Sequence, residues 1–309
     1  MGASDEAARP RRWLRLLGRG LGVFLGVLLV LGVAVYAASA RRLGRRFEVQ
    51  GEALEIATGA EAIARGGRLA RTRGCTDCHG QTAAGQTFLR AMPVMELRPS
   101  NLTPGGRTAR WAGRDWTRAV RHCVRPDGSG IPFMPCLDYR GLDDRDLGEI
   151  VAWLRSLPPS ANDPGASVLG PLGRVLFLKG DLPYLVAEQI DHSAPVAPAP
   201  PVGPTVAYGR YVAAGCTGCH GQGFSGGHIP GTPPDWPNAA NLTPDPATGI
   251  AAMTEAQFEA AITQGRKRDG GAINPAYMPW QQFALLTADE RRALWLFLRT
   301  VAPRPAGQR

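Results

Sequence analysis

The stretch GCTDCHGQ at residues 74–81 returns almost unchanged as GCTGCHGQ at residues 215–222. Three shorter segments recur in the same order. Asn-Leu-Thr-Pro occurs at 101–104 and 241–244, Met-Pro at 134–135 and 278–279, and Leu-Arg at 154–155 and 298–299. Self-similarity at a spacing of about 140 residues indicates a duplicated unit. The sequence therefore predicts two homologous domains in tandem, which a chain of 309 residues can accommodate.

Each long repeat contains the pattern Cys-x-x-Cys-His. Two thiols one helical turn apart can add to the two vinyl groups of one porphyrin, and the following histidine is then held beneath the iron. The chain has only 6 Cys and 5 His, so two copies at the repeat spacing are not expected by chance. We expect two covalently bound haem c groups, with these residues as thioether and proximal ligands: Cys75, Cys78 and His79, then Cys216, Cys219 and His220.

Three other uses of the pattern fit the sequence less well. A thioredoxin-like redox pair favours a βαβ context, which the sequence does not show, and does not require the following histidine. A zinc site needs four ligands, and Cys, Cys and His leave each repeat one short. Disulfides within each Cys-x-x-Cys would give no role to His79 or His220.

The second axial ligand of each iron is predicted from the repeat. Met134 and Met278 occupy equivalent positions, and each is followed by proline. The competing side chains without a counterpart in the other repeat are Met92, Met95, His122 and His228, and Met253 falls early in an expected helix. Because a thioether ligand completes the coordination sphere and raises the potential, methionine at both sites predicts electron transfer without substrate chemistry.

The basic charge of the chain is concentrated around one apolar segment. Residues 1–46 hold nine arginines against Asp5 and Glu6, whereas the remainder is nearly neutral, which argues against a nucleic-acid-binding surface. Residues 21–40 carry no charged side chain and, at ~1.5 Å per residue, would span about 30 Å as a helix. We expect a transmembrane anchor with a cytoplasmic N-terminus. A signal peptide cleaved after Ala38-Ser39-Ala40 is the alternative.

The remaining pattern predicts an all-α fold, because apolar residues recur at helical spacing and no convincing period-two alternation occurs. Asp143-x-x-Asp146 and Thr287-x-x-Glu290 resemble capping boxes, and we expect them at the start of the last helix of each domain. The predicted divisions are a tail and anchor at 1–46, a first domain at 47–158, a Pro-rich interdomain linker at 159–206, a second domain at 207–303 and a tail at 304–309. An apolar piece of the linker, 175–178, is expected to pack against a neighbour.

On these motifs the chain resembles class I dihaem cytochromes c, especially the membrane-bound cytochrome c subunits of bacterial periplasmic dehydrogenases for alcohols, aldehydes and sugars. The resemblance covers Gly59–Pro158 and Tyr208–Pro303. It implies two tandem class I cytochrome c domains after the membrane helix, with both haems attached outside the cytoplasmic membrane. It also implies that Asn101 and Asn241 bond a haem propionate, with a capped turn as the alternative. Many such subunits carry three haems, and this chain has two motifs.

Cys123 and Cys136 occur only in the first repeat, where their counterparts in the second are Gly265 and Trp280. In an oxidising periplasm they are expected to form a disulfide beside Met134, with two free thiols as the alternative.

The function predicted from the sequence is electron transfer by a non-enzymatic cytochrome at the bacterial cytoplasmic membrane, with its haem domains in the periplasm. Its expected redox partners are a periplasmic dehydrogenase, a quinol-oxidising complex or a terminal oxidase, and no nucleic acid. A dihaem peroxidase and a haem-containing sensor or assembly module are the alternatives.

Overall fold

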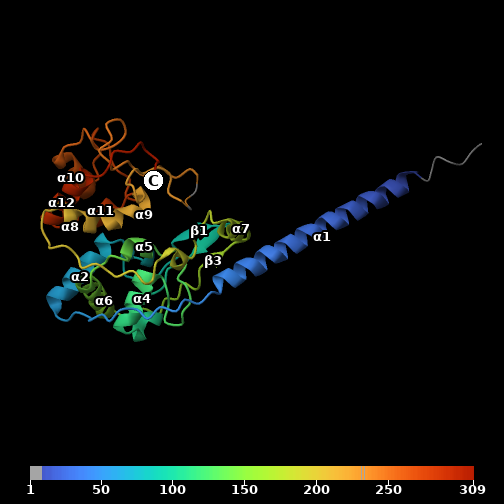
Figure 1. Ribbon diagram of the computed structural model, residues 1–309, viewed down its shortest axis with the longest axis horizontal. Coiled ribbons are helices and arrows are strands. Elements are labelled where there is room, and N and C mark those ends of the chain that lie inside the picture. The colour runs from blue at the N-terminus through green and yellow to red at the C-terminus, as the bar shows by residue number, and fades with distance from the viewer. Residues whose placement is uncertain (1–8, 231, 233) are drawn as a thin grey trace, which may run out of the picture.

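The computed structural model describes residues 9–230, 232 and 234–309, so residues 1–8 of the predicted N-terminal tail lie outside the described part. Figure 1 shows one long helix, α1 (Arg9–Leu43), projecting from a body made of two groups of helices. Three short strands, β1 (Leu89–Ala91), β2 (Met95–Leu97) and β3 (Val168–Leu169), form the extended structure of the described chain. The predicted all-α class is confirmed.

The two domains repeat one order of α-helices, with a short 3-10 helix at a different place in each. The helices of the first domain are α2 (Ala60–Thr72), α3 (Cys75–His79), η1 (Arg107–Arg110), α4 (Gly113–His122), α5 (Cys136–Tyr139) and α6 (Asp144–Ser156). The helices of the second are α8 (Val206–Ala213), η3 (Ala214–Cys216), α9 (Thr217–His220), α10 (Glu255–Gln264), α11 (Trp280–Phe283) and α12 (Ala288–Leu298). In each domain the Cys-x-x-Cys-His motif follows the first helix, and the Met-Pro pair directly precedes the short α5 or α11.

The first and last helices of each domain cross closely, α2 against α6 and α8 against α12. A glycine makes each crossing possible, because a Cβ atom at Gly66 would collide with the carbonyl of Glu149 and one at Gly209 with the carbonyl of Ala293. Apolar side chains from these helices form the two domain cores. The crossing is therefore one more feature that the duplication has preserved.

Both predicted caps are present at the last helices. Thr287 Oγ1 accepts from the N–H of Glu290, whose carboxylate accepts from the N–H of Thr287, so the pair forms a full capping box. Asp143 caps α6 by accepting from the N–H of Arg145. Asp146 does not close the box at α6, because its carboxylate instead binds Arg65 and Tyr211.

The interval 159–206, predicted as a linker, contains structure of its own. Its strand β3 pairs antiparallel with β2, and α7 (Pro171–Lys179) and η2 (Val186–Gln189) follow. Phe177, within the apolar piece expected to pack, is buried in a cluster with Met95 and Leu97 of the first domain. We call β1, β2, β3 and α7 the sheet module. Figure 1 shows it beside the body-side end of α1, which it contacts through α7.

Candidate haem sites

The histidines of the two motifs have the same hydrogen-bonded environment. Nδ1 of His79 lies 2.7 Å from the carbonyl oxygen of Ser100, and Nδ1 of His220 lies 2.7 Å from that of Ala240. A carbonyl only accepts, so each Nδ1 carries the proton and each Nε2 keeps its lone pair for a metal. The carbonyl partners immediately precede the two Asn-Leu-Thr-Pro segments, which explains why these segments recur with the motif.

The protonation of both rings suits metal ligation. Burial lowers the pKa of His79 and of His220 below the ordinary 6.5, against the opposing effect of the carbonyl hydrogen bond. Both imidazoles are therefore neutral at physiological pH, and the neutral form is the one that binds iron. The histidine ring and its backbone partner act together as a preoriented ligand.

The four cysteines of the motifs form no disulfide in the described part of the chain. Burial raises the pKa of three of their thiols, those of Cys75, Cys78 and Cys216, to about 12, and it also raises that of Cys219. They are therefore protonated and poorly reactive toward solvent. Unpaired thiols next to a prepared histidine match the donor set of covalent haem c.

The two methionine segments also share one backbone geometry. Pro135 caps α5 at φ −80° and ψ 59°, and Pro279 caps α11 at φ −76° and ψ 61°. The carbonyl of Met134 accepts from the N–H of Cys136 at 2.9 Å, and that of Met278 accepts from the N–H of Trp280 at 2.7 Å. Met134 and Met278 thus occupy equivalent, partly exposed positions. Their role as axial ligands stays a prediction.

The structure joins Cys123 and Cys136 in a disulfide. Cys123 ends α4 in the left-handed conformation at φ 54°, and Gly265 ends α10 in the same conformation at φ 62°. A Cβ atom at Gly265 would collide with the ring of Trp280. In the second domain, the Trp280 indole therefore packs against Gly265 at the position where the first domain has its disulfide.

The amides of Asn101 and Asn241 are used within the protein. The NH₂ group of Asn101 donates to the carbonyls of Ser160 at 2.7 Å and Asn162 at 3.0 Å, while its Oδ1 accepts from the N–H of Thr103. Because both amide hydrogens have protein acceptors, the geometry favours the capped turn over the propionate contact that the resemblance implied.

The amide of Asn241 is used in the same way. Its NH₂ group donates to Thr248 and to the carbonyl of Arg304, and its Oδ1 accepts from Thr243. The same capped turn is therefore present in the second domain.

Some buried donors have no partner within the protein and could bind a haem carboxylate. Within the described residues, Trp116 Nε1 and Thr108 Oγ1 in the first domain and Ser225 Oγ in the second are buried and have no hydrogen-bond partner. Buried polar groups without partners are costly, so a bound group that supplies acceptor oxygens would stabilise them. Trp116 packs in the same cluster as Cys75, beside the first motif. These residues therefore fit the cofactor, and no repeated sequence signal marked them.

A polar junction binds the two domains together next to the motifs. The hydroxyl of Tyr211, on α8, donates to Asp146 Oδ2 at 2.6 Å, and the buried Arg73 guanidinium lies 4.6 Å from the Tyr211 ring centroid. Arg73 also donates to the carbonyls of Tyr211 and Val212 at 3.0 Å. Since Arg73 directly precedes the first motif and Tyr211 shortly precedes the second, the junction connects the two haem-binding loops.

A second set of contacts joins the same regions. Asp138 of α5 accepts from the hydroxyl of Thr217 at 2.5 Å and from the amide of Gln222 at 2.9 Å, and both donors belong to the second motif. Burial is the main cause of the raised pKa of Cys78, and the Cys219 thiol contributes to it. The two motifs therefore lie within electrostatic reach of one another.

Two family models match the two domains separately. The model for cytochrome c matches residues 206–302, and that for cytochrome c oxidase, cbb3-type, subunit III matches residues 61–154. Each half of the chain therefore contains a cytochrome c domain. Domains of this kind imply covalently bound haem c.

Curated relatives show the same relationship. This cytochrome is 36% identical over 102 residues to the cytochrome c subunit of alcohol dehydrogenase (quinone) from Gluconacetobacter polyoxogenes, a match that covers 31% of this chain and 22% of the relative. It is 36% identical over 102 residues to the gluconate 2-dehydrogenase cytochrome c subunit from Pantoea cypripedii, covering 31% and 23%. The fructose dehydrogenase cytochrome subunit from Gluconobacter japonicus is 32% identical over 104 residues, covering 31% and 21%.

The chain thus spans about a fifth of the length of these relatives. All three are cytochrome subunits of dehydrogenases. Relatives of this kind are electron-transfer subunits and are not themselves catalytic, in agreement with the prediction made from the sequence.

Proposed function

We propose that this cytochrome is a membrane-anchored, periplasmic dihaem protein that carries single electrons from a dehydrogenase or a quinol donor to a downstream acceptor or oxidase. The observation that carries the proposal is the duplicated histidine site, in which Nδ1 of His79 and of His220 donates to a backbone carbonyl at the same 2.7 Å. Two equally prepared ligand sites in one chain support two haems of the same kind.

The chain's own residues prepare both sites for reversible one-electron chemistry. When bound, haem supplies an iron that cycles between the ferric and ferrous states. The carbonyls of Ser100 and Ala240 hold each imidazole in one tautomer and one orientation, which limits reorganisation as the iron charge changes. Met134 and Met278, as the second axial ligands, would keep substrates from the metal, which supports electron transfer over the peroxidase alternative.

The junction supports transfer between the two haems. Tyr211, Arg73 and Asp146 form a largely buried network, and Asp138 adds a direct bond to Thr217 of the second motif. A network of charge-assisted hydrogen bonds restrains the two domains as one unit. A constant separation between the motifs would support electron exchange at a constant rate.

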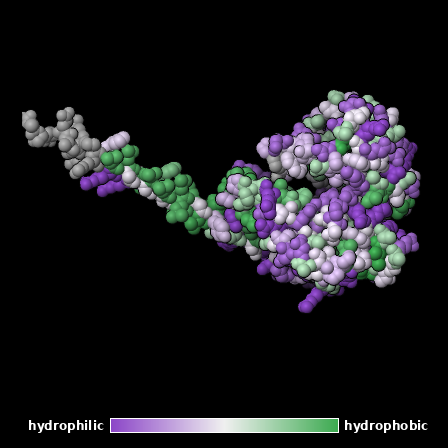
Figure 2. Space-filling model, turned by 180° about the vertical axis from the view of Figure 1, so that it is seen from behind, coloured by the Kyte–Doolittle hydropathy of each residue, from purple (hydrophilic) through white to green (hydrophobic). Residues whose placement is uncertain are grey.

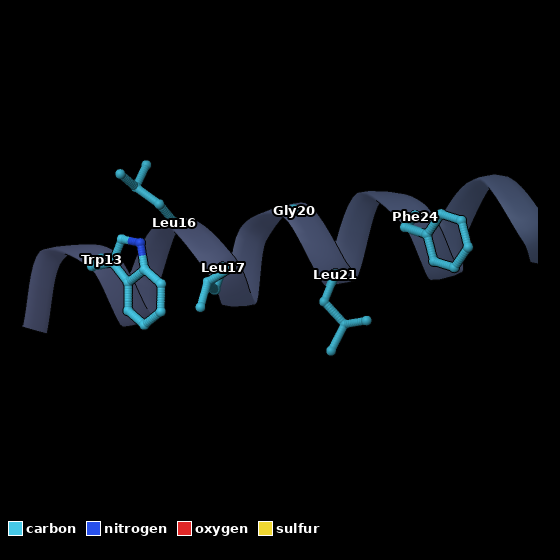
Figure 3. A pocket seen from close by; sticks show the side chains of 6 residues that line it. All are labelled: Trp13, Leu16, Leu17, Gly20, Leu21 and Phe24. Carbon is cyan, nitrogen blue, oxygen red and sulfur yellow. The ribbon is translucent and has the colours of Figure 1, made fainter.

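The long helix supports membrane attachment. Figure 3 shows Trp13, Leu16, Leu17, Leu21 and Phe24 projecting from a single helix beside Gly20, and these five side chains are mostly exposed. The candidate span, Trp13–Leu43, is long and apolar enough to cross a membrane. Apolar side chains exposed all around a helix are stable in lipid and not in water. A dehydrogenase as electron donor is supported by the printed names of the relatives.

The number of haems is tested on the full chain produced in a bacterium that matures c-type cytochromes. We expect two covalently retained haems per chain on a denaturing gel, one in the Cys75→Ala/Cys78→Ala variant and one in the Cys216→Ala/Cys219→Ala variant. Retention of a single haem by the unmodified chain would contradict the dihaem proposal.

The topology is tested in spheroplasts of the same strain. Added protease should degrade both haem domains while a fragment containing α1 is protected. Protection of the haem domains until the membrane is permeabilised would place them in the cytoplasm and contradict the proposal.

A further inference from the structure

Helix α7 lies against the end of α1 that would leave the membrane. The Arg174 guanidinium lies 4.1 Å from the ring centroid of Tyr36 and donates to Ser39 Oγ at 2.7 Å, while Arg42 donates to the carbonyl of Phe177 at 2.8 Å. Tyr36 lies inside the uncharged segment 21–40, about 6 Å below its end at 1.5 Å per residue. Arginine and tyrosine at this depth are typical of the membrane interface.

The face of α7 turned away from the protein carries apolar side chains in its first turns and ends at the exposed Lys179, whose Nζ lies 2.7 Å from Asp181 Oδ2. Phe177 and Gly173 face the interior and are buried, whereas Leu172 and Val175 share the opposite face with 47% and 39% of their surface exposed. Val168 of the sheet module and the flanking residues Phe88 and Met92 are also apolar and exposed, and the charged Arg90 of β1 lies exposed in the same segment. Figure 2 shows hydrophobic surface on the lobe next to α1. Exposed apolar side chains on one lobe indicate contact with something other than water.

The module is held rigidly to α1. Glu188, which follows α7, accepts from Arg42 at 2.7 Å and from Arg45 at 3.2 Å. Ser39 is fully buried beneath Arg174. The apolar surface of α1 therefore continues onto α7 without a mobile connection, so a bilayer that surrounds the end of α1 would also meet Leu172 and Val175.

We propose that α7 and the adjoining edge of the sheet module lie in the interface of the lipid bilayer, with Leu172 and Val175 in contact with acyl chains. This inference rests on the proposed function only in that α1 spans the membrane. The contact sets the tilt of the two haem domains relative to the bilayer, because Phe133 of the first domain packs against the apolar cluster of the module. The haem motifs then face a membrane-bound redox partner at a defined height.

Spin labels on the full, haem-loaded chain in lipid nanodiscs test this contact. The natural cysteines are committed to haem or to the disulfide, so a single added cysteine can be labelled. The test positions are Leu172→Cys and Val175→Cys. Val202→Cys is the aqueous control, because Val202 lies in the interdomain segment and is 65% exposed. Leu29→Cys in α1 is the lipid control. For each label, the rate of collision with oxygen, which concentrates in lipid, is divided by the rate of collision with a water-soluble nickel chelate. The haem content of each variant verifies that it has folded.

We expect the oxygen-to-nickel ratio at positions 172 and 175 to exceed that at 202 several-fold and to approach that at 29. If the ratios at 172 and 175 equal that at 202 while position 29 gives a lipid-like ratio, this inference is wrong and the proposed function is unaffected. The apolar face of α7 would then be a surface for a protein partner. A water-like ratio at position 29 would instead show that α1 does not span the bilayer, and both proposals would fail. Because two positions on α7 are labelled, one misfolded variant does not remove the test.

Discussion

Glu290 of α12 accepts a hydrogen bond from Arg68 of α2 at 2.6 Å, although 222 residues separate them in the sequence. The carboxylate is 2% exposed and also accepts from the backbone N–H of Thr287, with the Tyr208 hydroxyl 3.4 Å away. One side chain therefore both caps the last helix of the second domain and ties that domain to the first. The stability of the domain junction and of the helix depends on the same charge.

The junction should weaken in acid. Burial alone would raise the pKa of Glu290, but the Arg68 hydrogen bond, the Thr287 N–H and the charge of Arg68 outweigh it and lower the pKa below the ordinary 4.5. The bridge therefore contributes its full stability above pH 4.5 and loses it as the pH falls through the folded-state pKa. Thermal unfolding followed against pH should show the melting temperature falling over this range.

Glu290→Gln tests the origin of that fall. The neutral amide should lower the free energy of unfolding at neutral pH by about 2 kcal/mol, because Arg68 loses its charged partner. The variant should also lose less stability on acidification than the unmodified chain. Asp289→Asn, an exposed neighbour in the same helical turn, is the matched control and should change neither property. An unchanged acid dependence in Glu290→Gln would rule out this carboxylate as the titrating group.

Gly265→Ala should destabilise the second domain. The residue has φ 62°, and an added Cβ would collide with the Trp280 ring, so the substitution combines backbone strain with overpacking. We expect a loss of about 2 kcal/mol or more in denaturant unfolding. Gly270→Ala provides the control, because Gly270 also has a positive φ, of 86°, but open space around its Cβ position. Equal losses in the two variants would show that the contact with Trp280 contributes nothing.

Removing the disulfide should loosen the first methionine segment and leave the second unchanged. The bond between Cys123 and Cys136 closes a loop that contains Met134, and cross-links of this size stabilise by roughly 3 kcal/mol. In Cys123→Ala/Cys136→Ala, added imidazole should displace the axial methionine of one haem at lower concentration, as followed in the ferric absorbance spectrum. Equal ease of displacement before and after the substitution would mean that the disulfide does not restrain Met134.

Met134→Ala and Met278→Ala should each remove half of the sulfur-to-iron charge-transfer absorbance of the ferric protein. Loss of the thioether should also lower the midpoint potential of the affected haem, since methionine ligation raises it. Met92→Ala is the control, because Met92 is exposed on the sheet module and has no counterpart in the second repeat. Retention of the full absorbance in either variant would transfer the ligand role to another side chain.

The histidine sites show which features could be predicted from residues close together in the sequence. The spacing of Cys75, Cys78 and His79 predicted one haem, because two thiols one helical turn apart match the two vinyl groups of a porphyrin, and the structure places these residues on one short helix. The recurrence of Asn-Leu-Thr-Pro signalled a conserved turn, but the propionate role suggested for Asn101 is not what the hydrogen bonds favour. Its amide is used by the carbonyls of residues 160 and 162, far along the chain, which no local pattern could reveal.

The interval 159–206 shows a second limit of predicting structure from the sequence. Its proline-rich part reads as a spacer by composition, and the apolar residues 175–178 offered no sign of where they would pack. Strand β3 pairs with β2 and α7 packs against α1, and both partners lie far away in the sequence. Short elements of this kind are too weak to form alone, so their structure depends on tertiary contacts.

By itself, the sequence determined the duplication, the helical class, the covalent cofactor chemistry and the apolar N-terminal segment, because each follows from residues close together in the chain or from an exact repeat. Only the tertiary structure decided how the two domains meet, through Arg68 with Glu290 and Arg73 with Tyr211, and that α7 lies against α1. The physical reason is the range of the interactions: covalent attachment and helical periodicity are local, whereas a buried ion pair or an exposed apolar face depends on residues that only folding brings together.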